Sequence, residues 1–117
     1  MAQPFNLNII QGSDYGLNLT VTVSGGSEPM DLTGASARLQ ARPTVTSQAT
    51  YIDLTDENGI TILEPPTSGL MQINLSAAET SAINVDSGVY DLELITAAGQ
   101  VTRLLEGRVI LDREVTR

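Results

Sequence analysis

The residues with the clearest potential for chemistry in this sequence are acidic. Asp91 and Glu93 stand two positions apart in a segment that alternates polar and apolar residues, so both carboxylates should lie on one face of a strand. Glycosidases use paired carboxylates at separations that such a pair could span. Arg103, however, is predicted to face Glu93 across a hairpin, as an ordinary charge pair on a solvated sheet face. The acidic pair is therefore interpreted as part of the architecture, and the chain is not predicted to be an enzyme.

Oxygen-bearing side chains also gather between residues 53 and 58. Asp53, Asp56 and Glu57, together with Asn58, are ligands of the kind that calcium prefers. Their spacing differs from the D-x-D-x-D-G pattern of a calcium-binding loop. The same residues are typical of a turn, and we interpret the segment as a strand, a hairpin turn and a second strand. No metal or other cofactor is predicted.

The composition excludes several classes of function. The 117 residues include no Cys, His or Trp, and all six basic residues are Arg. Disulfide scaffolds, cysteine nucleophiles and histidine-based catalysis are therefore excluded, as is Schiff-base chemistry, which needs Lys. A net charge of −8 disfavours nucleic acid as a partner, because phosphate binding needs clustered basic residues. No apolar run approaches the roughly 20 residues of a membrane span, so no membrane partner is expected.

Alternating polar and apolar residues, separated by turn-forming clusters, predict a series of short strands. The capping box Ser76-Ala77-Ala78-Glu79 predicts one short helix near residues 76–83. We therefore predict a single all-β domain over residues 1–117, an antiparallel Ig-like β-sandwich of about seven to nine strands. A partly open β-barrel is the alternative. The expected strands cover 4–11, 15–23, 35–43, 51–54, 60–63, 70–75 and the two arms of a hairpin between Gly88 and the C-terminus.

The C-terminal hairpin is the strongest structural signal. Its arms are joined by Ala97-Ala98-Gly99, which fits a type I turn closed by Gly99 in the left-handed conformation. The second arm cannot alternate strictly along its whole length. Leu104 and Val109 are both expected to face the core, but they are five residues apart, and strict alternation would point them to opposite faces of the sheet. A β-bulge at Glu106-Gly107 is predicted to correct the phase. The expected register pairs Ile95 with Val101, Glu93 with Arg103 and Leu92 with Leu104.

Two parts of the sequence are candidates for contacts with other proteins. The segment 1–11 is extended and rich in Asn, so it could be a docking arm that adds a strand to a neighbour, or simply the first strand of its own sandwich. Arg38 and Arg42 lie on the outer face of a later strand, where they could form ion pairs between subunits. The candidate contact residues of the N-terminal segment are Phe5, Asn6 and Asn8.

The order of these segments resembles a pattern in small virion proteins of tailed bacteriophages. The turn Asp31-Leu32-Thr33-Gly34 is followed by an alternating strand that ends at Arg42, a combination that opens the core of a β-sandwich in those proteins. The likeness is to the N-terminal domains of upper baseplate and fibre-anchoring proteins of siphophages, and it runs from about Leu17 to the C-terminus. The later matching segments are Asn58–Ile62, Gly69–Leu75, Ser76–Thr80, Val89–Leu94, Gly107–Leu111 and Val115–Arg117.

The resemblance implies a non-enzymatic structural component of the virion, assembled in the cytoplasm of the host bacterium. Because the baseplate proteins continue into further domains, a separate sandwich is expected to be an adaptor at the tail, baseplate or fibre attachment. Its expected partners are other virion proteins and copies of itself in a homo-oligomer. The alternatives are a capsid decoration (head) protein and a carbohydrate-binding module. The aromatic candidates for a sugar site are Tyr15, Tyr51 and Tyr90, of which Tyr90 looks buried.

Overall fold

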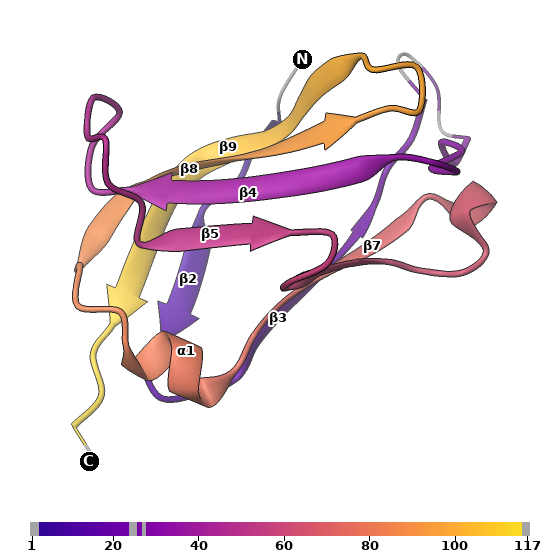
Figure 1. Cartoon of the computed structure of the whole chain (residues 1–117). Coiled ribbons are helices and arrows are strands. Elements are labelled where there is room, and N and C mark those ends of the chain that lie inside the picture. Colours follow the sequence, from indigo (N-terminus) through magenta and orange to yellow (C-terminus); the bar gives the residue numbers. More distant parts are fainter. Residues whose placement is uncertain (1–2, 24–25, 27, 116–117) are drawn as a thin grey trace.

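The computed structural model describes residues 3–23, 26 and 28–115, which fold into two packed β-sheets with one short α-helix (Figure 1). The larger sheet has the strand order β1-β9-β8-β4-β5, and β2 also pairs with β9. The smaller sheet has the order β3-β7-β6. The elements are β1 (Gln3–Pro4), β2 (Leu7–Ile10), β3 (Tyr15–Thr20), β4 (Ser36–Arg42), β5 (Ile52–Thr55), β6 (Ile60–Ile62), the 3-10 helix η1 (Pro66–Ser68), β7 (Leu70–Leu75), α1 (Ala77–Ser81), β8 (Ser87–Ile95) and β9 (Val101–Asp112).

The arrangement confirms the predicted β-sandwich with one short helix. Its core is aliphatic, because alternate residues of each sheet point inward. In β4 the small residues Ala37 and Ala41 flank Leu39, and all three are buried. The rest of the buried apolar core consists of Leu7, Ile9, Val21, Leu32, Ile52, Leu54, Ile60, Met71, Ile73, Leu75, Ile83, Tyr90, Leu92, Leu94, Leu105, Val109 and Leu111.

The N-terminal segment forms part of its own sheet, so of the two alternatives for this segment residues 3–10 follow the second, the first strand of the chain's own sandwich. β1 and β2 run parallel to β9, with Leu7 opposite Val109 and Ile9 opposite Leu111. Leu7 and Ile9 are only 2% and 0% exposed, and burying this apolar pair holds the segment on its own sandwich. The parallel pairing also departs from a purely antiparallel sandwich.

The three contact candidates of this segment have local roles. The Phe5 N–H donates to the Glu106 carbonyl oxygen at 2.9 Å, and Asn6 Oδ1 accepts from the Arg108 N–H at 3.0 Å. Asn8 is exposed on β2. Phe5 and Asn6 therefore fix the junction between β1 and β2 along β9. Residues 1 and 2 of the predicted arm lie outside the described residues.

The C-terminal hairpin forms as predicted at its tip and differs further down. Gly99 has a φ of 88°, and its N–H donates to the Thr96 carbonyl oxygen at 2.8 Å, which closes the loop. The pairs of Ile95 with Val101 and of Glu93 with Arg103 are confirmed. The register shift, however, lies between Leu92 and Glu93, so Leu92 pairs with Leu105. The prediction of a bulge at Glu106-Gly107 is therefore wrong, because the extra residue is Leu104, which lets Leu105, Val109 and Leu111 all point inward.

Gly107 has a different structural role from the predicted one. It pairs with Tyr90 in regular register, away from the register shift. A Cβ at this position would lie 2.3 Å from the Phe5 carbonyl oxygen, a distance that real Cβ atoms do not reach. Glycine is therefore required here by the close approach of the N-terminal segment.

The segment that includes Asp53, Asp56 and Glu57 is a crossover between sheets. β5 belongs to the larger sheet and β6 to the smaller one, so the predicted hairpin is wrong. The turn is closed by the Thr55 N–H, which donates to the Asn58 carbonyl oxygen at 3.0 Å, and Asp56 Oδ1 accepts from the N–H of a residue on β4, Ala37, at 3.2 Å. Among the described residues, no group of three acidic side chains is placed to hold a metal ion.

The short helix begins as predicted. Ser76 Oγ accepts from the Glu79 N–H at 3.1 Å, and Glu79 Oε1 accepts from the Ser76 N–H at 2.9 Å, so the capping box is confirmed. The helix ends at Ser81, two residues before the expected Ile83, whose side chain is buried in the core. In the part of the chain that the structure describes, no helix has the length and apolar character needed to cross a membrane.

Tyr90 links the hairpin to the N-terminal segment, and its phenol is expected to ionise late. Its hydroxyl donates to the Phe5 carbonyl oxygen at 2.5 Å, and burial, with a smaller repulsion from Tyr15, raises the pKa of Tyr90 to about 12. The neutral phenol is thus favoured in the folded state, so its contribution to stability is complete below pH 10 and is lost as the pH rises towards 12. An ultraviolet absorbance titration should show one tyrosine ionising near pH 12, and Tyr90→Phe should lack that step. Ionisation of all three tyrosines near pH 10 would contradict this assignment.

Candidate protein-docking surface

The outer face of β4, β8 and β9 carries a grid of mainly polar side chains. They alternate with the buried residues of the same strands, so they point away from the core. The strand register arranges them in three rows that cross the sheet. The rows are Arg38–Glu93–Arg103, Gln40–Asp91–Glu106 and Arg42–Val89–Arg108.

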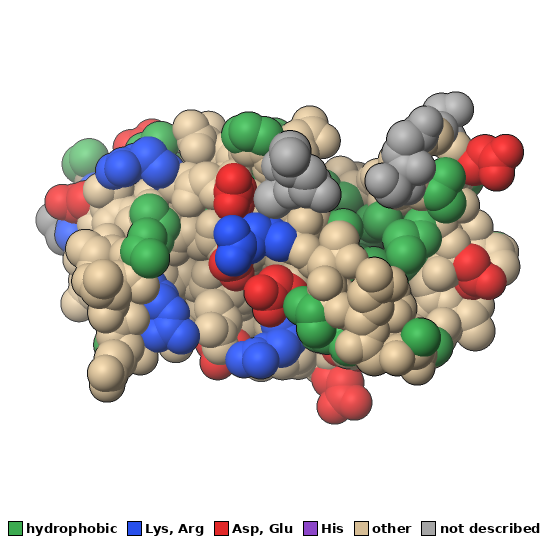
Figure 2. Space-filling model, turned by 90° about the horizontal axis from the view of Figure 1, so that it is seen from above, with side chains coloured by type: hydrophobic (Ala, Val, Ile, Leu, Met, Phe, Trp, Pro, Cys, Tyr) green, Lys and Arg blue, Asp and Glu red, His purple; other side chains and the backbone are tan. Residues whose placement is uncertain are grey.

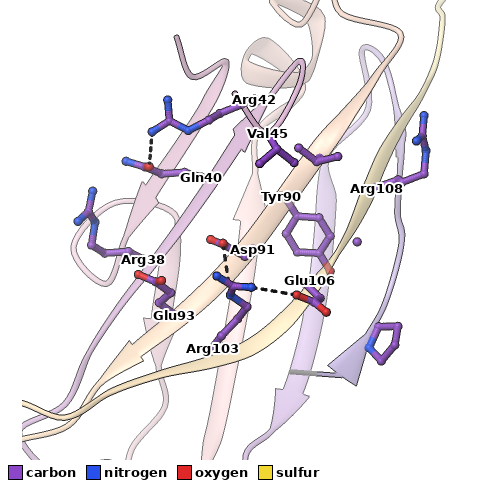
Figure 3. A pocket seen from close by; sticks show the side chains of 13 residues that line it. Arg38, Gln40, Arg42, Val45, Tyr90, Asp91, Glu93, Arg103, Glu106 and Arg108 are labelled. Atoms are coloured by element: carbon purple, nitrogen blue, oxygen red, sulfur yellow. Dashed lines mark hydrogen bonds and ion pairs between the residues drawn. The ribbon is translucent and has the colours of Figure 1, made fainter. Parts of the chain in front are cut away.

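Arg103 offsets part of the negative charge of the middle row. Asp91 and Glu106 lie directly opposite each other, an arrangement that is destabilising for like charges. The guanidinium of Arg103 reaches over from the neighbouring row, with Nε 3.5 Å from Asp91 Oδ2 and Nη1 3.1 Å from Glu106 Oε1 (Figure 3). The predicted pairing of Glu93 with Arg103 across the two strands is therefore confirmed. The predicted charge pair is not formed, because Glu93 has no salt bridge among the described residues.

Three other arginines of the face, Arg38, Arg42 and Arg108, have no carboxylate partner among the described residues. Arg42 is held by neutral acceptors. Its Nη1 donates to the Ser47 carbonyl oxygen at 3.0 Å, and its Nη2 donates to Gln40 Oε1 at 3.0 Å, the second of which is drawn in Figure 3. These guanidinium groups keep their capacity to bind a carboxylate of another molecule in the two-bond geometry that arginine favours.

The face is hollowed over these strands. The hollow has a volume of about 680 Å³, and Val45, which is 80% exposed, forms part of its wall. Figure 2, which views the molecule from above, shows arginine and acidic side chains side by side in the middle of one face. The lining residues are Pro4, Arg38, Gln40, Arg42, Val45, Val89, Tyr90, Asp91, Glu93, Arg103, Glu106, Gly107 and Arg108.

The charge of this face differs from that of the whole chain. Four of the six arginines line the hollow, but only three of the fourteen acidic residues do. The face therefore has a small excess of positive charge on a chain whose net charge is −8. Such a contrast favours a partner that presents carboxylates to this face.

Comparison with known proteins identifies the fold. No family model and no curated protein matches the chain. Among solved structures, it is similar to a chicken TCR, with a TM-score of 0.60 and 12% sequence identity. The fold is Ig-like. The match covers 98% of this chain and 56% of that chain, so the sequence spans little more than half of the TCR chain, and at this identity the likeness concerns the fold alone.

The core of this chain differs from the core of antibody domains. In variable-type Ig domains one sheet holds strands G, F, C and C′, which correspond in order to β9, β8, β4 and β5. Antibody domains bury a Trp of strand C against a disulfide whose strand F cysteine follows a tyrosine by two residues. This chain has neither Cys nor Trp. Leu39 on β4 and Leu92 on β8, two residues after Tyr90, pair with each other in the sheet register and are buried.

The structure brings together some of the predicted site residues and separates others. Arg38 and Arg42 lie on one face with Asp91 and Glu93, as their alternation predicts. Phe5, Asn6 and Asn8 instead belong to the N-terminal strands. Arg108 is a further member of the face. The inward Val109 already implies that Arg108 points outward, but its place beside Val89 and Arg42 depends on the register of β4, β8 and β9, which the sequence did not reveal.

The tyrosines do not form a platform for a sugar ring. Tyr90 is buried, as expected, and Tyr15 and Tyr51 are half-buried against the core. Burial raises the pKa of Tyr15 and of Tyr51 above the usual value. Sugar-binding platforms depend on exposed aromatic rings, so this arrangement gives little support to a carbohydrate-binding module.

Proposed function

We propose that this chain is a non-enzymatic structural protein of a tailed-phage virion, which docks a neighbouring virion protein on the outer face of β4, β8 and β9. The observation that carries the proposal is the hollow in which Arg38, Arg42 and Arg108 have no carboxylate partner among the described residues. The resemblance of the Asp31–Gly34 turn and the strand that follows it to siphophage baseplate proteins supports the virion setting. A packed sandwich supplies a rigid frame for such a surface.

The geometry favours an acidic segment of the partner. Arg38 and Arg42 are four residues apart on β4, so about 13 Å of strand separates their Cα atoms. A partner segment with two carboxylates at that spacing binds both guanidinium groups. Asp91 and Glu93 lie on the neighbouring strand β8, opposite Gln40 and Arg38, and repel a continuous polyanion, so the partner needs spaced acidic residues. The exposed side chain of Val45 adds an apolar contact at the wall.

Cross-linking within the virion tests this proposal. A photoreactive amino acid in place of Val45 should join the chain to one neighbouring virion protein, which mass spectrometry then identifies. The control position is Thr61, which is exposed on β6 in the other sheet. A tail or baseplate protein as the product supports the adaptor role, and a capsid protein would make the chain a decoration protein. Absence of the chain from purified virions, or the same product from Thr61, would contradict the proposal.

The double variant Arg38→Gln/Arg42→Gln is expected to bind the cross-linked partner at least about 100-fold more weakly, because two charge-assisted hydrogen-bonding groups are lost at about 1.5–3 kcal/mol each. The matched control Thr61→Glu/Asn74→Glu lowers the net charge equally at two exposed positions of the smaller sheet. This control should bind the partner with an affinity within a few fold of that of the parent chain. Isothermal titration calorimetry measures both variants, and an equal loss in the two would mean that net charge, and not this face, governs binding.

A further inference from the structure

β3 forms an open edge of the smaller sheet. Among the described residues it pairs with β7 and with no other strand. Val21, which continues the same register, donates its N–H to the Gly69 carbonyl oxygen at 2.7 Å. The backbone groups of an antiparallel strand alternate in direction from one residue to the next. The N–H and C=O groups of Gly16, Asn18 and Thr20 therefore point to the open side.

The other edges of the two sheets are better protected in the part of the chain that the structure describes. Natural sheets limit pairing at their edges with charges, proline, bulges or short strands. β5 has four residues and carries Asp53, and β6 has three residues. β1 and β2 are separated by two residues, and β1 contains Pro4. β3 has six residues, none of them charged and none proline, so it presents the longest unprotected row of backbone groups.

The core-facing side of β3 is also incompletely covered. Tyr15, Leu17 and Leu19 pack against the core but are only half-buried. Their neighbours on β7, including Met71 and Ile73, are buried. The uncovered flank is therefore apolar. Covering it with another strand contributes a favourable free energy of about 25 cal/mol for each Å² of apolar surface removed from water.

We propose that β3 pairs with β3 of a second copy of this chain, antiparallel and around a two-fold axis at Leu17. In that register Leu17 faces the second copy's Leu17, and Tyr15 faces the second copy's Leu19. Gly16 faces the second copy's Asn18, and these two residues carry the outward backbone groups, so they form the hydrogen-bonded pairs. The two three-stranded sheets then form one six-stranded sheet across the dimer.

A second copy suits this edge because the strand is complementary to itself and uncharged. The nearest acidic residue, Asp14, accepts from the Ala77 N–H at 2.8 Å at the start of α1. Two copies each carry a net charge of −8, so their long-range repulsion opposes association and salt screens it. The β3 dimer should therefore tighten as the ionic strength rises. Docking of an acidic partner on the outer face of β4, β8 and β9 should instead weaken as the ionic strength rises, so the salt dependence distinguishes the two interactions.

A single cysteine can report this contact, because the chain has none of its own. Leu17→Cys places two cysteines opposite each other with Cα atoms about 4.5 Å apart, within the range of a disulfide. Leu19→Cys is the matched control, since it lies on the same side of β3 but about 13 Å along the strand from its counterpart. Mild oxidation and non-reducing electrophoresis should give a covalent dimer for Leu17→Cys and a monomer for Leu19→Cys. Equal cross-linking in the two, or none in Leu17→Cys, would overturn the proposal.

Asn18→Pro tests the dimer without a cysteine. Proline removes an N–H that points to the open side, and it leaves the hydrogen bonds between β3 and β7 in place. Size-exclusion chromatography with light scattering should give twice the chain mass of 12.4 kDa for the parent and the single mass for Asn18→Pro, with circular dichroism confirming that the variant is folded. A parent that is monomeric at every salt concentration, or a dimer that persists in a folded Asn18→Pro, would overturn the proposal. Both results are independent of the Arg38→Gln/Arg42→Gln test, so the dimer and the proposed function can fail separately.

Discussion

Replacing Gly107 by alanine is expected to lower the free energy of unfolding by about 2–3 kcal/mol and the melting temperature by roughly 10 °C. A Cβ at this position would lie 2.3 Å from the Phe5 carbonyl oxygen, a backbone atom that cannot turn aside. The same oxygen accepts the Tyr90 hydroxyl, so a displacement of Phe5 disturbs two contacts. Thermal unfolding followed by circular dichroism measures the effect.

Gly16→Ala is the matched control for this substitution. Gly16 also lies in a strand, but the nearest atom to an added Cβ is Asn74 Oδ1, at 3.6 Å. Alanine there should be neutral or stabilising by about 0.5–1 kcal/mol, because glycine loses more conformational freedom on folding. Similar unfolding free energies for the two variants would contradict the close approach at Gly107. Amide hydrogen exchange at Leu7 and Ile9 should locate the loosened strands in Gly107→Ala.

Leu92→Ala is expected to lower the free energy of unfolding still further, by about 3–4 kcal/mol, because it leaves a cavity in the centre of the core. Leu92 is 0% exposed and lies between Leu39 of β4 and Leu105 of β9 in the sheet register. Antibody domains link their two sheets by a disulfide, whereas this chain contains no Cys. The contact between the sheets therefore depends on buried side chains such as Leu92, without a disulfide. Urea denaturation measures the loss.

Two substitutions serve as controls for the Leu92 cavity. Leu70→Ala removes the same atoms from a side chain that is 38% exposed, and it should lower the free energy of unfolding by less than about 1 kcal/mol. Leu92→Met nearly conserves the volume and should lower it by less than about 1.5 kcal/mol. An effect of Leu92→Ala no larger than that of Leu70→Ala would contradict a central role for Leu92.

The local features of the fold could be predicted from the sequence because they depend on neighbouring residues. The Ser76–Glu79 capping box and the left-handed Gly99 at the hairpin tip need only a few residues in a row, and both are present. The alternation in residues 35–43, which placed Arg38 and Arg42 outside, is likewise present in β4. These signals were sufficient for the fold class.

The features that were missed depend on contacts between distant parts of the chain. The parallel pairing of Leu7 and Ile9 with β9 joins residues about a hundred positions apart. The bulge lies at Leu104 because the register of the whole hairpin, and not the nearest glycine, decides which residues turn inward. Turn residues alone do not distinguish a hairpin from a crossover between sheets. The sequence therefore predicts a hairpin between β5 and β6, whereas the two strands belong to different sheets.

The candidate docking surface was only partly visible in the sequence. Arg38 and Arg42 were identified from the alternation of one strand. Arg108 joins them through the register of β8 and β9, which a single strand does not reveal. The engagement of Arg103 with Glu106 follows from the bulge, which places Glu106 on the outer face opposite Asp91.

The amount of this chain in purified virions, measured by quantitative mass spectrometry, tests the docking role most directly. The parent and the control Thr61→Glu/Asn74→Glu should be incorporated at the same copy number. Arg38→Gln/Arg42→Gln, supplied at the same level, should be depleted about tenfold or more if its affinity falls as expected. Equal incorporation of all three, or the absence of the parent chain from virions, would contradict the proposed function.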